Sequence, residues 1–256
     1  MLALLLFACS DPPTLEVTVV DAWGVAIEGA QVKQETVTET FVTDSDGHAA
    51  IPAEVGTLHL MAGKEGYIKD FSVVTILDGE EEGQSVTFSL FPEPEVAGFY
   101  GVGPAQYHPL ETAAIEVVKS EMTTYHGIKN LPDVAFNPKG QPARFVFKTE
   151  LNNNEIKRQD LKLSRLKYLD TAEVTGLLGP ETVKLSLYVA DEDSAFEFKG
   201  LQSQDEYLVV TDEALEPGIY AFHAQGILYS TADSSMESLP PSMKVAFPFE
   251  IKGPKP

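Results

Sequence analysis

The chain of 256 residues contains a single cysteine and few basic side chains. One thiol cannot form an intramolecular disulfide, so stability has to come from packed apolar cores. Against 39 aspartate and glutamate residues there are only 18 lysine and arginine residues, which gives a formal net charge of −21. A surface of that sign repels phosphates, which argues against nucleic acid as a partner. After residue 9, no apolar run approaches the roughly 20 residues that a membrane-spanning helix needs.

Common catalytic and nucleotide-binding signatures are also missing. No Gly-x-Ser-x-Gly sequence occurs, so the nucleophile elbow of α/β-hydrolases is excluded. The glycine-rich segment at 98–103 leads into Pro104 instead of a helix, which excludes a dinucleotide fingerprint or a phosphate loop. We therefore expect no cofactor and no enzymatic activity.

The amino-terminal segment ending at Cys9 is the most informative part of the chain. Residues 2–8 are uninterruptedly apolar, and Cys9 is followed by polar and turn-forming residues. Seven apolar residues suit a secretory signal and are too few to cross a bilayer as a helix. The sequence Leu6-Phe7-Ala8-Cys9 resembles the lipobox of a bacterial lipoprotein signal.

This resemblance implies that residues 1–8 are a cleaved signal peptide and that Cys9 becomes the lipidated mature N-terminus, with 9–13 as a tether. Two or three acyl chains anchor a protein durably on a membrane without spanning it. Ser10 is the kind of residue that, by the same resemblance, permits sorting to the outer membrane. No basic residue precedes the apolar run, so either the start codon lies further upstream or the signal is atypical. The alternative is a frayed first strand with an ordinary buried thiol.

Residues 14–92 have the pattern of a small all-β sandwich. The segment 15–19, Leu-Glu-Val-Thr-Val, alternates apolar and polar side chains with the period of a half-buried strand. Turn signals recur at short intervals, as in Thr43-Asp44-Ser45-Asp46-Gly47, where Gly47 suits a positive φ. Such closely spaced short strands and turns are typical of sandwiches.

Four groups of residues in this segment resemble the carboxypeptidase regulatory-like domain. The resemblance implies a transthyretin-like sandwich of about seven strands. In that family the module mostly aids folding, spaces domains or docks, and it does not catalyse. The groups are Val17-x-Val19 with Asp21 and Gly24, Ile27-Glu28-Gly29-Ala30-x-Val32, Thr43-Asp44-x-Asp46-Gly47, and Gly63-Lys64-Glu65-Gly66-Tyr67.

Residues 93–97 form a linker, and the two prolines of Pro92-Glu93-Pro94-Glu95 stiffen it towards an extended form. Residues 98–256 follow as a second domain, whose family we do not recognise. It contains several strand-like runs, while 110–122 fits either a helix or a strand. We predict a larger β-sandwich with at most one or two short helices. The fold class is therefore all-β, with two sandwich domains in tandem.

One histidine motif raises the possibility of zinc chemistry. His108 and Glu111 have the His-x-x-Glu spacing of the first ligand pair of zinc carboxypeptidases, and His223 is a distant third candidate. Pro109 interrupts the motif, and the domain lacks the alternating strand–helix pattern of that catalytic fold. We therefore predict no metal site.

Two sets of residues are candidates for non-catalytic binding. A basic stretch could meet an acidic partner, lipopolysaccharide phosphates or the chain's own acidic domain, although charges that protect strand edges would look the same. Four aromatic residues could line a glycan platform, although single aromatic residues in a sandwich are usually core. The basic stretch is Lys157, Arg158, Lys162, Arg165 and Lys167, and the aromatic residues are Trp23, Tyr100, Tyr107 and Tyr125.

Taken together, the sequence predicts a non-catalytic, lipid-anchored protein of the bacterial cell envelope, placed at the outer membrane through Cys9. We expect a scaffold, adhesion or protein-docking surface whose partner is an envelope protein or a glycan. The alternative is a glycan- or peptide-binding lipoprotein that uses residues 98–256. A zinc hydrolase acting through His108 and Glu111 is the third hypothesis.

Overall fold

The computed structural model describes residues 14–77, 84–120, 123–151, 153–177, 179–201, 205–228, 230–231 and 244–253. The described residues divide into two compact units at the bond between Glu93 and Pro94, with Leu201 as the one exception. Cys9, the predicted signal peptide and the predicted tether lie outside the described residues. Within the described part of the chain, no helix is long and apolar enough to cross a membrane.

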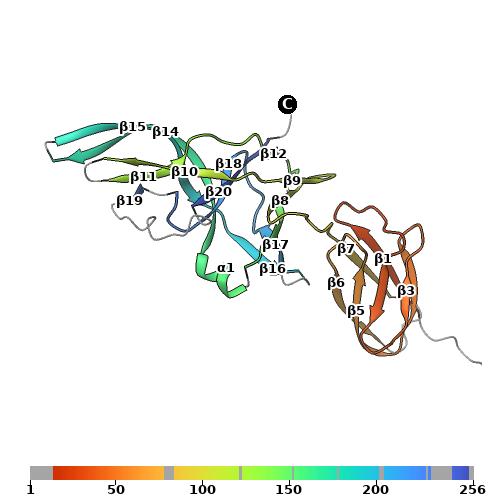
Figure 1. Ribbon diagram of the computed structural model, residues 1–256. Coiled ribbons are helices and arrows are strands. Elements are labelled where there is room, and N and C mark those ends of the chain that lie inside the picture. The colour runs from red at the N-terminus through yellow and green to blue at the C-terminus, as the bar shows by residue number, and fades with distance from the viewer. Residues whose placement is uncertain are drawn as a thin grey trace, which may run out of the picture. The chain divides into compact units, whose positions relative to one another are not determined.

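The described part of unit 1 is a sandwich of seven strands in two sheets (Figure 1). One sheet has the order β4-β1-β7, and the other has the order β3-β2-β5-β6. The pairing is antiparallel except between β1 and β7, which run parallel. The strands are β1 (Thr14–Asp21), β2 (Gln31–Gln34), β3 (Thr40–Val42), β4 (His48–Pro52), β5 (Gly56–Gly63), β6 (Asp70–Ile76) and β7 (Ser85–Leu90).

The alternation seen in the sequence places the core of unit 1 as expected. Leu15, Val17 and Val19 of β1 have no exposed surface, whereas the residues between them point outwards or are only half-buried. They join one cluster with Phe88 of β7 and Leu60 of β5, so the apolar faces of both sheets meet. Burying the faces of two sheets against each other is what makes a sandwich stable.

The predicted turn at residues 43–47 is also present. The Asp44 carboxylate accepts hydrogen bonds from the backbone N–H groups of Asp46 and His48, both at 2.9 Å. The bond from His48 is the main reason that the pKa of Asp44 lies below its usual value. Gly47 has a φ of 76°, which confirms the positive φ expected there.

Unit 2 is built from a five-stranded sheet, an eight-stranded sheet and one short helix among its described residues. The prediction of an all-β fold with at most one or two short helices is therefore confirmed. The five-stranded sheet consists of β16 (Phe196–Gly200), β17 (Glu206–Thr211), β13 (Arg144–Lys148), β8 (Gly98–Val102) and β9 (Tyr107–Pro109), and the helix is α1 (Asn153–Gln159).

The eight-stranded sheet closes on itself through six of its strands. The order β10-β11-β15-β14-β18-β20 becomes a ring because β10 also pairs with β20, at Ala113↔Ala246. The ring interior holds small buried side chains, among them Ala113, Ala221 and Ala246. The same cluster also contains the larger side chains Ile128, Leu166, Ile227 and Leu228, so small and large residues together fill the closed sheet. The strands are β10 (Ala113–Lys119), β11 (Thr124–Ile128), β12 (Ala135–Phe136), β14 (Leu161–Gly176), β15 (Gly179–Asp193), β18 (Gly218–Ala224), β19 (Ser230–Thr231) and β20 (Val245–Ile251).

Residues 110–122, which fit either a helix or a strand in the sequence, contain strand β10. Its pairing with β11 and β20 at the closure of the ring favours the extended form. The choice between a helix and a strand therefore depended on pairing partners, of which β20 is distant in the chain.

The other face of the ring packs against the five-stranded sheet through phenylalanine rings. Phe222 of β18 has no exposed surface and stacks on Phe99 of β8 with ring centroids 4.4 Å apart. Phe145 of β13 meets Phe222 edge to face at 4.9 Å. These contacts form the main core of unit 2.

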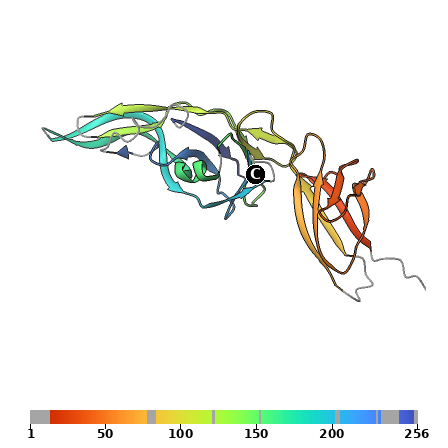
Figure 2. The ribbon, with the colours of Figure 1, turned by 60° about the horizontal axis from the view of Figure 1, so that its bottom comes forward.

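A long hairpin extends beyond this core. Strands β14 and β15 run for 16 and 15 residues, but only residues 161–165 of β14 pair with β18. Further out, Leu185, Leu187 and Val189 of β15 pack with Tyr125 of β11 in a separate small cluster. Figures 1 and 2 show this hairpin and the β10–β11 hairpin extending together from the rest of unit 2. We call residues 166–187 together with β10 and β11 the arm.

Candidate functional site

The basic residues predicted for partner binding lie mostly on β14. Lys162, Arg165 and Lys167 are in this strand, and Lys157 is exposed on α1. The side chain of Arg158 is outside the described part of the structure.

Each of the three β14 cations lies beside a carboxylate of the same unit. Lys162 pairs with Asp160 at 3.2 Å, Arg165 with Glu216 at 3.4 Å, and Lys167 with Asp191 at 2.6 Å. Partly exposed pairs of this kind contribute little stability, on the order of 0–1 kcal/mol each. They offset the positive charge locally, so any partner of this stretch meets a mixed surface.

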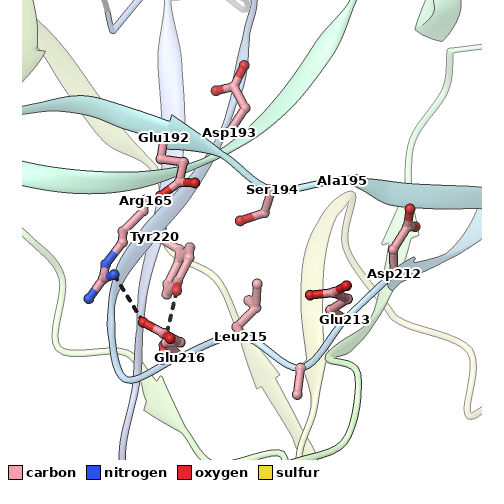
Figure 3. A pocket seen from close by; sticks show the side chains of 11 residues that line it. Arg165, Glu192, Asp193, Ser194, Ala195, Asp212, Glu213, Leu215, Glu216 and Tyr220 are labelled. Carbon is pink, nitrogen blue, oxygen red and sulfur yellow. Dashed lines mark hydrogen bonds and ion pairs between the residues drawn. The ribbon is translucent and has the colours of Figure 1, made fainter.

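Arg165 also belongs to an acidic pocket of about 430 Å³, shown in Figure 3. Five carboxylate side chains line the pocket. Arg165 and Tyr220 both contact Glu216, since the Tyr220 hydroxyl donates to the Glu216 carbonyl at 3.0 Å. The lining carboxylates are Glu192, Asp193, Asp212, Glu213 and Glu216. No group of three or more Asp, Glu, His or Cys within the described ranges is arranged to hold a metal ion.

The zinc hypothesis required His108, Glu111 and His223 to converge. The ring of His108 stacks on Phe136, with centroids 5.7 Å apart. His223 is only 1% exposed, and both of its ring nitrogens already have partners. The described structure therefore does not present these three side chains as one ligand set.

His223 instead belongs to a buried polar chain that the sequence did not indicate. Its Nε2 lies 2.8 Å from the Oγ of Ser164, and its Nδ1 lies 2.8 Å from the carbonyl oxygen of Ala224. The Ser164 Oγ is also 2.5 Å from the Asp193 carboxylate. Strand pairing produces this arrangement, because β14 lies between β15, which carries Asp193, and β18, which carries His223. The three residues are 29 or more positions apart, so no local motif could reveal them.

Serine, histidine and aspartate are the residue types of a hydrolytic triad, but here they contact one another in a different arrangement. In a triad the carboxylate orients the imidazole, and the imidazole activates an accessible serine. In this chain the carboxylate contacts the serine, and Ser164 has no exposed surface from which to reach a substrate. The imidazole Nδ1 donates to a backbone carbonyl. The contacts therefore indicate a structural role, in which buried polar groups from three strands lie within hydrogen-bond distance of one another.

Burial is the main reason that the pKa of His223 lies below its usual value, although the Ala224 carbonyl and Asp193 act against this. A second buried histidine, His126 of β11, is 3% exposed, and burial with help from Lys119 lowers its pKa as well. Its Nδ1 has no hydrogen-bond partner within the described structure. A buried polar atom without a partner costs stability.

We expect His126→Leu to stabilise unit 2 by about 1 kcal/mol at pH 7, and by more at pH 5. The folded-state pKa lies below the unfolded value of about 6.5, so acidification protonates the unfolded chain first and destabilises the wild type. Urea unfolding followed by circular dichroism at both pH values measures the difference. His59→Leu, at a side chain in unit 1 that is 58% exposed, is the control and should leave unit 2 unchanged. A loss of stability in His126→Leu at pH 5 would contradict this account.

The aromatic residues predicted as a glycan platform have different environments. Tyr125 is buried in the small cluster of the arm. Tyr100 and Tyr107 are half-buried neighbours with centroids 5.7 Å apart, and the Tyr100 hydroxyl donates to the Val96 carbonyl. Trp23 is half-buried in unit 1. Within unit 2, the three tyrosines therefore do not form a single exposed row.

Comparison with known proteins identifies no family for this chain. No protein-family profile and no curated protein matches it. The membership of residues 14–92 in the carboxypeptidase regulatory-like family and the lipoprotein signal both stay predictions.

Several solved structures show partial similarity at 10% sequence identity. A DUF3823 family protein from Bacteroides ovatus matches over 94% of this chain and 100% of its own, with a TM-score of 0.25. A DUF3823 family protein from Parabacteroides merdae matches over the same shares, with a TM-score of 0.23. The major pilin subunit of Bacillus cereus matches over 86% of this chain and 66% of its own, with a TM-score of 0.24. Scores this low support no functional conclusion.

Proposed function

We propose that the protein is a non-catalytic, lipid-anchored binding protein of the bacterial cell envelope, and that the arm of unit 2 contacts its partner. The observation that carries the proposal is the length of the arm. Most of β14 and β15 extends past the strands that enclose the core of unit 2. The arm adds only a small separate cluster of buried side chains to the unit, and a hairpin by itself is only marginally stable in water. A role in binding a partner, in addition to any role in stability, explains the presence of the arm.

The surface of the arm supports this proposal. Large apolar side chains are exposed on it: Leu177 between β14 and β15 is 79% exposed, Tyr168 is 51% exposed, and Val117 of β10 is 43% exposed. The Tyr168 ring lies against that of Tyr188, with centroids 5.1 Å apart. Aromatic and aliphatic side chains held in place by neighbours are the kind that interfaces bury.

Membrane attachment is the second part of the proposal, and it depends on Cys9. We expect the mature protein to begin at a diacylated Cys9, with the mass of the acyl groups visible by mass spectrometry. Cys9→Ser should leave the precursor uncleaved and without acyl groups. The variant should therefore no longer be recovered as a lipidated protein in the membrane fraction. Ser10→Ala is the matched control and should still be lipidated. An intact Met1 on the wild-type protein from its native cell would contradict lipidation.

The arm is tested by crosslinking in the native envelope. A photoreactive benzoylphenylalanine at Leu177 should give one predominant adduct after illumination, because the arm tip would lie in the interface. The same residue at Val25, which is 61% exposed in unit 1, is the control and should not give that adduct. Equal adducts from both positions, or none from either, would refute the arm as the binding surface.

A further inference from the structure

We infer that unit 2 also binds a small, neutral aromatic molecule in a cavity between its two sheets. The cavity has a volume of about 520 Å³, within the range of small-molecule sites. Phe99 and Phe147 of the five-stranded sheet line one side, and Phe247 and His223 of the eight-stranded sheet line the other. This inference is independent of the arm and of the lipid anchor.

The walls of the cavity are aromatic and fixed in place. Phe147 stacks on Phe99 with centroids 4.1 Å apart and planes 13° apart, and Phe99 stacks in turn on the fully buried Phe222. Phe247 meets Phe99 edge-on at 5.0 Å. Phe147 and Phe247 are nevertheless only half-buried, although they lie between two sheets. The exposed surface of these two rings suits an aromatic ligand, because a pair of aromatic rings is stabilised by more than the burial of apolar area alone.

The mouth of the cavity has room for a ligand. Gly98 lines it, and a Cβ atom added there would have no heavy atom within 4 Å. Ala97 and Thr112, which also line the cavity, are exposed to solvent. A molecule can therefore enter past small side chains without displacing a bulky one.

The polar groups of the cavity favour a neutral ligand. At the rim, Lys148 lies 3.5 Å from the buried Glu206 carboxylate, so opposite charges offset each other. Both nitrogens of His223 are engaged with Ser164 and Ala224, which leaves the ring to act as wall. The hydroxyl of Thr149, a residue 8% exposed, accepts the Leu151 N–H and adds one polar contact point. Glu150, the other charged residue that lines the cavity, is exposed to solvent, so a charged ligand would lose its hydration between the phenylalanine rings without a buried charge to replace it.

The test uses the full chain with Cys9→Ser, which carries no acyl group, and the neutral fluorescent probe N-phenyl-1-naphthylamine. We expect one saturable site whose fluorescence rises on binding. Ala97→Trp fills the mouth and should weaken binding at least tenfold. Ala214→Trp, at an exposed alanine outside this cavity, should change it less than twofold. Circular dichroism checks that each variant is folded, and Thr112→Trp replaces Ala97→Trp if that variant is not.

Competition then tests the ligand class. Phenol should displace the probe at a concentration several-fold lower than cyclohexanol, which has the same size but no aromatic ring. Absence of probe binding to the Cys9→Ser protein overturns the inference. Equal binding of the probe to the Ala97→Trp and Ala214→Trp variants overturns it as well. Stronger displacement by cyclohexanol overturns the aromatic class.

Discussion

Phe222→Ala is expected to lower the free energy of unfolding of unit 2 by about 3–5 kcal/mol. The side chain has no exposed surface and lies in the core between the two sheets. It stacks on Phe99 and meets Phe145 edge to face, so its removal leaves a void that rigid neighbouring rings cannot fill. The cost combines lost burial with the residual cavity, which is why it exceeds a simple transfer energy.

Urea unfolding measures this effect, and the chain allows the two units to be followed separately. Trp23 is the only tryptophan and belongs to unit 1, so its fluorescence reports on that unit. Phe222→Ala should shift the circular dichroism transition of unit 2 and leave the Trp23 transition in place. Tyr168→Ala, at a half-exposed ring on the arm, is the control and should cost less than about 1 kcal/mol. Equal losses in the two variants would show that the aromatic core is not the source of stability.

Gly47→Ala is expected to destabilise unit 1 by about 3 kcal/mol, the second-largest effect. The left-handed backbone at φ 76° costs any other residue about 1–2 kcal/mol. In addition, an alanine Cβ would lie 2.5 Å from the Val19 carbonyl oxygen. That oxygen accepts the Ile27 N–H at 3.0 Å, and the Val19 N–H donates to Gly47, so β1 cannot shift to relieve the clash.

Gly24→Ala separates the two causes. Gly24 has a φ of 83°, but a Cβ there would have nothing within 4 Å. The free energy of unfolding of this variant should therefore fall only by the cost of the left-handed backbone conformation, about 1 kcal/mol. Both losses are measured from the Trp23 fluorescence transition in urea. Equal losses at the two positions would mean that contact with the Val19 carbonyl has no consequence.

Local sequence predicted unit 1 well for identifiable reasons. The alternation in β1 shows which side chains face the core, because successive residues of a strand point to opposite faces. The turn at residues 43–47 could be predicted because aspartate side chains bond to backbone N–H groups nearby and glycine accepts a positive φ. In both cases the interacting groups are within a few residues of one another.

For unit 2, the sequence predicted that strands are present but not how they pair. The closure of the ring depends on Ala113 meeting Ala246, 133 positions later, and no local pattern specifies that pairing. Register shifts within the β14–β15 pairing, such as the one between Arg165 and Leu166, also change which side chains share a face. The basic stretch was visible in the sequence, but its pairing with Asp160, Glu216 and Asp191 was not.

The sequence by itself determined the all-β class, the short strands of unit 1 and the position of the turn at Gly47, because these depend on periodicity and on contacts between near neighbours. The tertiary structure alone decided that Ser164, Asp193 and His223 meet, that phenylalanine rings from two sheets enclose a cavity, and that the arm extends beyond the core. The physical reason is that each of these features requires strands far apart in the chain to pair in one register. That register minimises the free energy of the whole packed unit and is not encoded in any single segment.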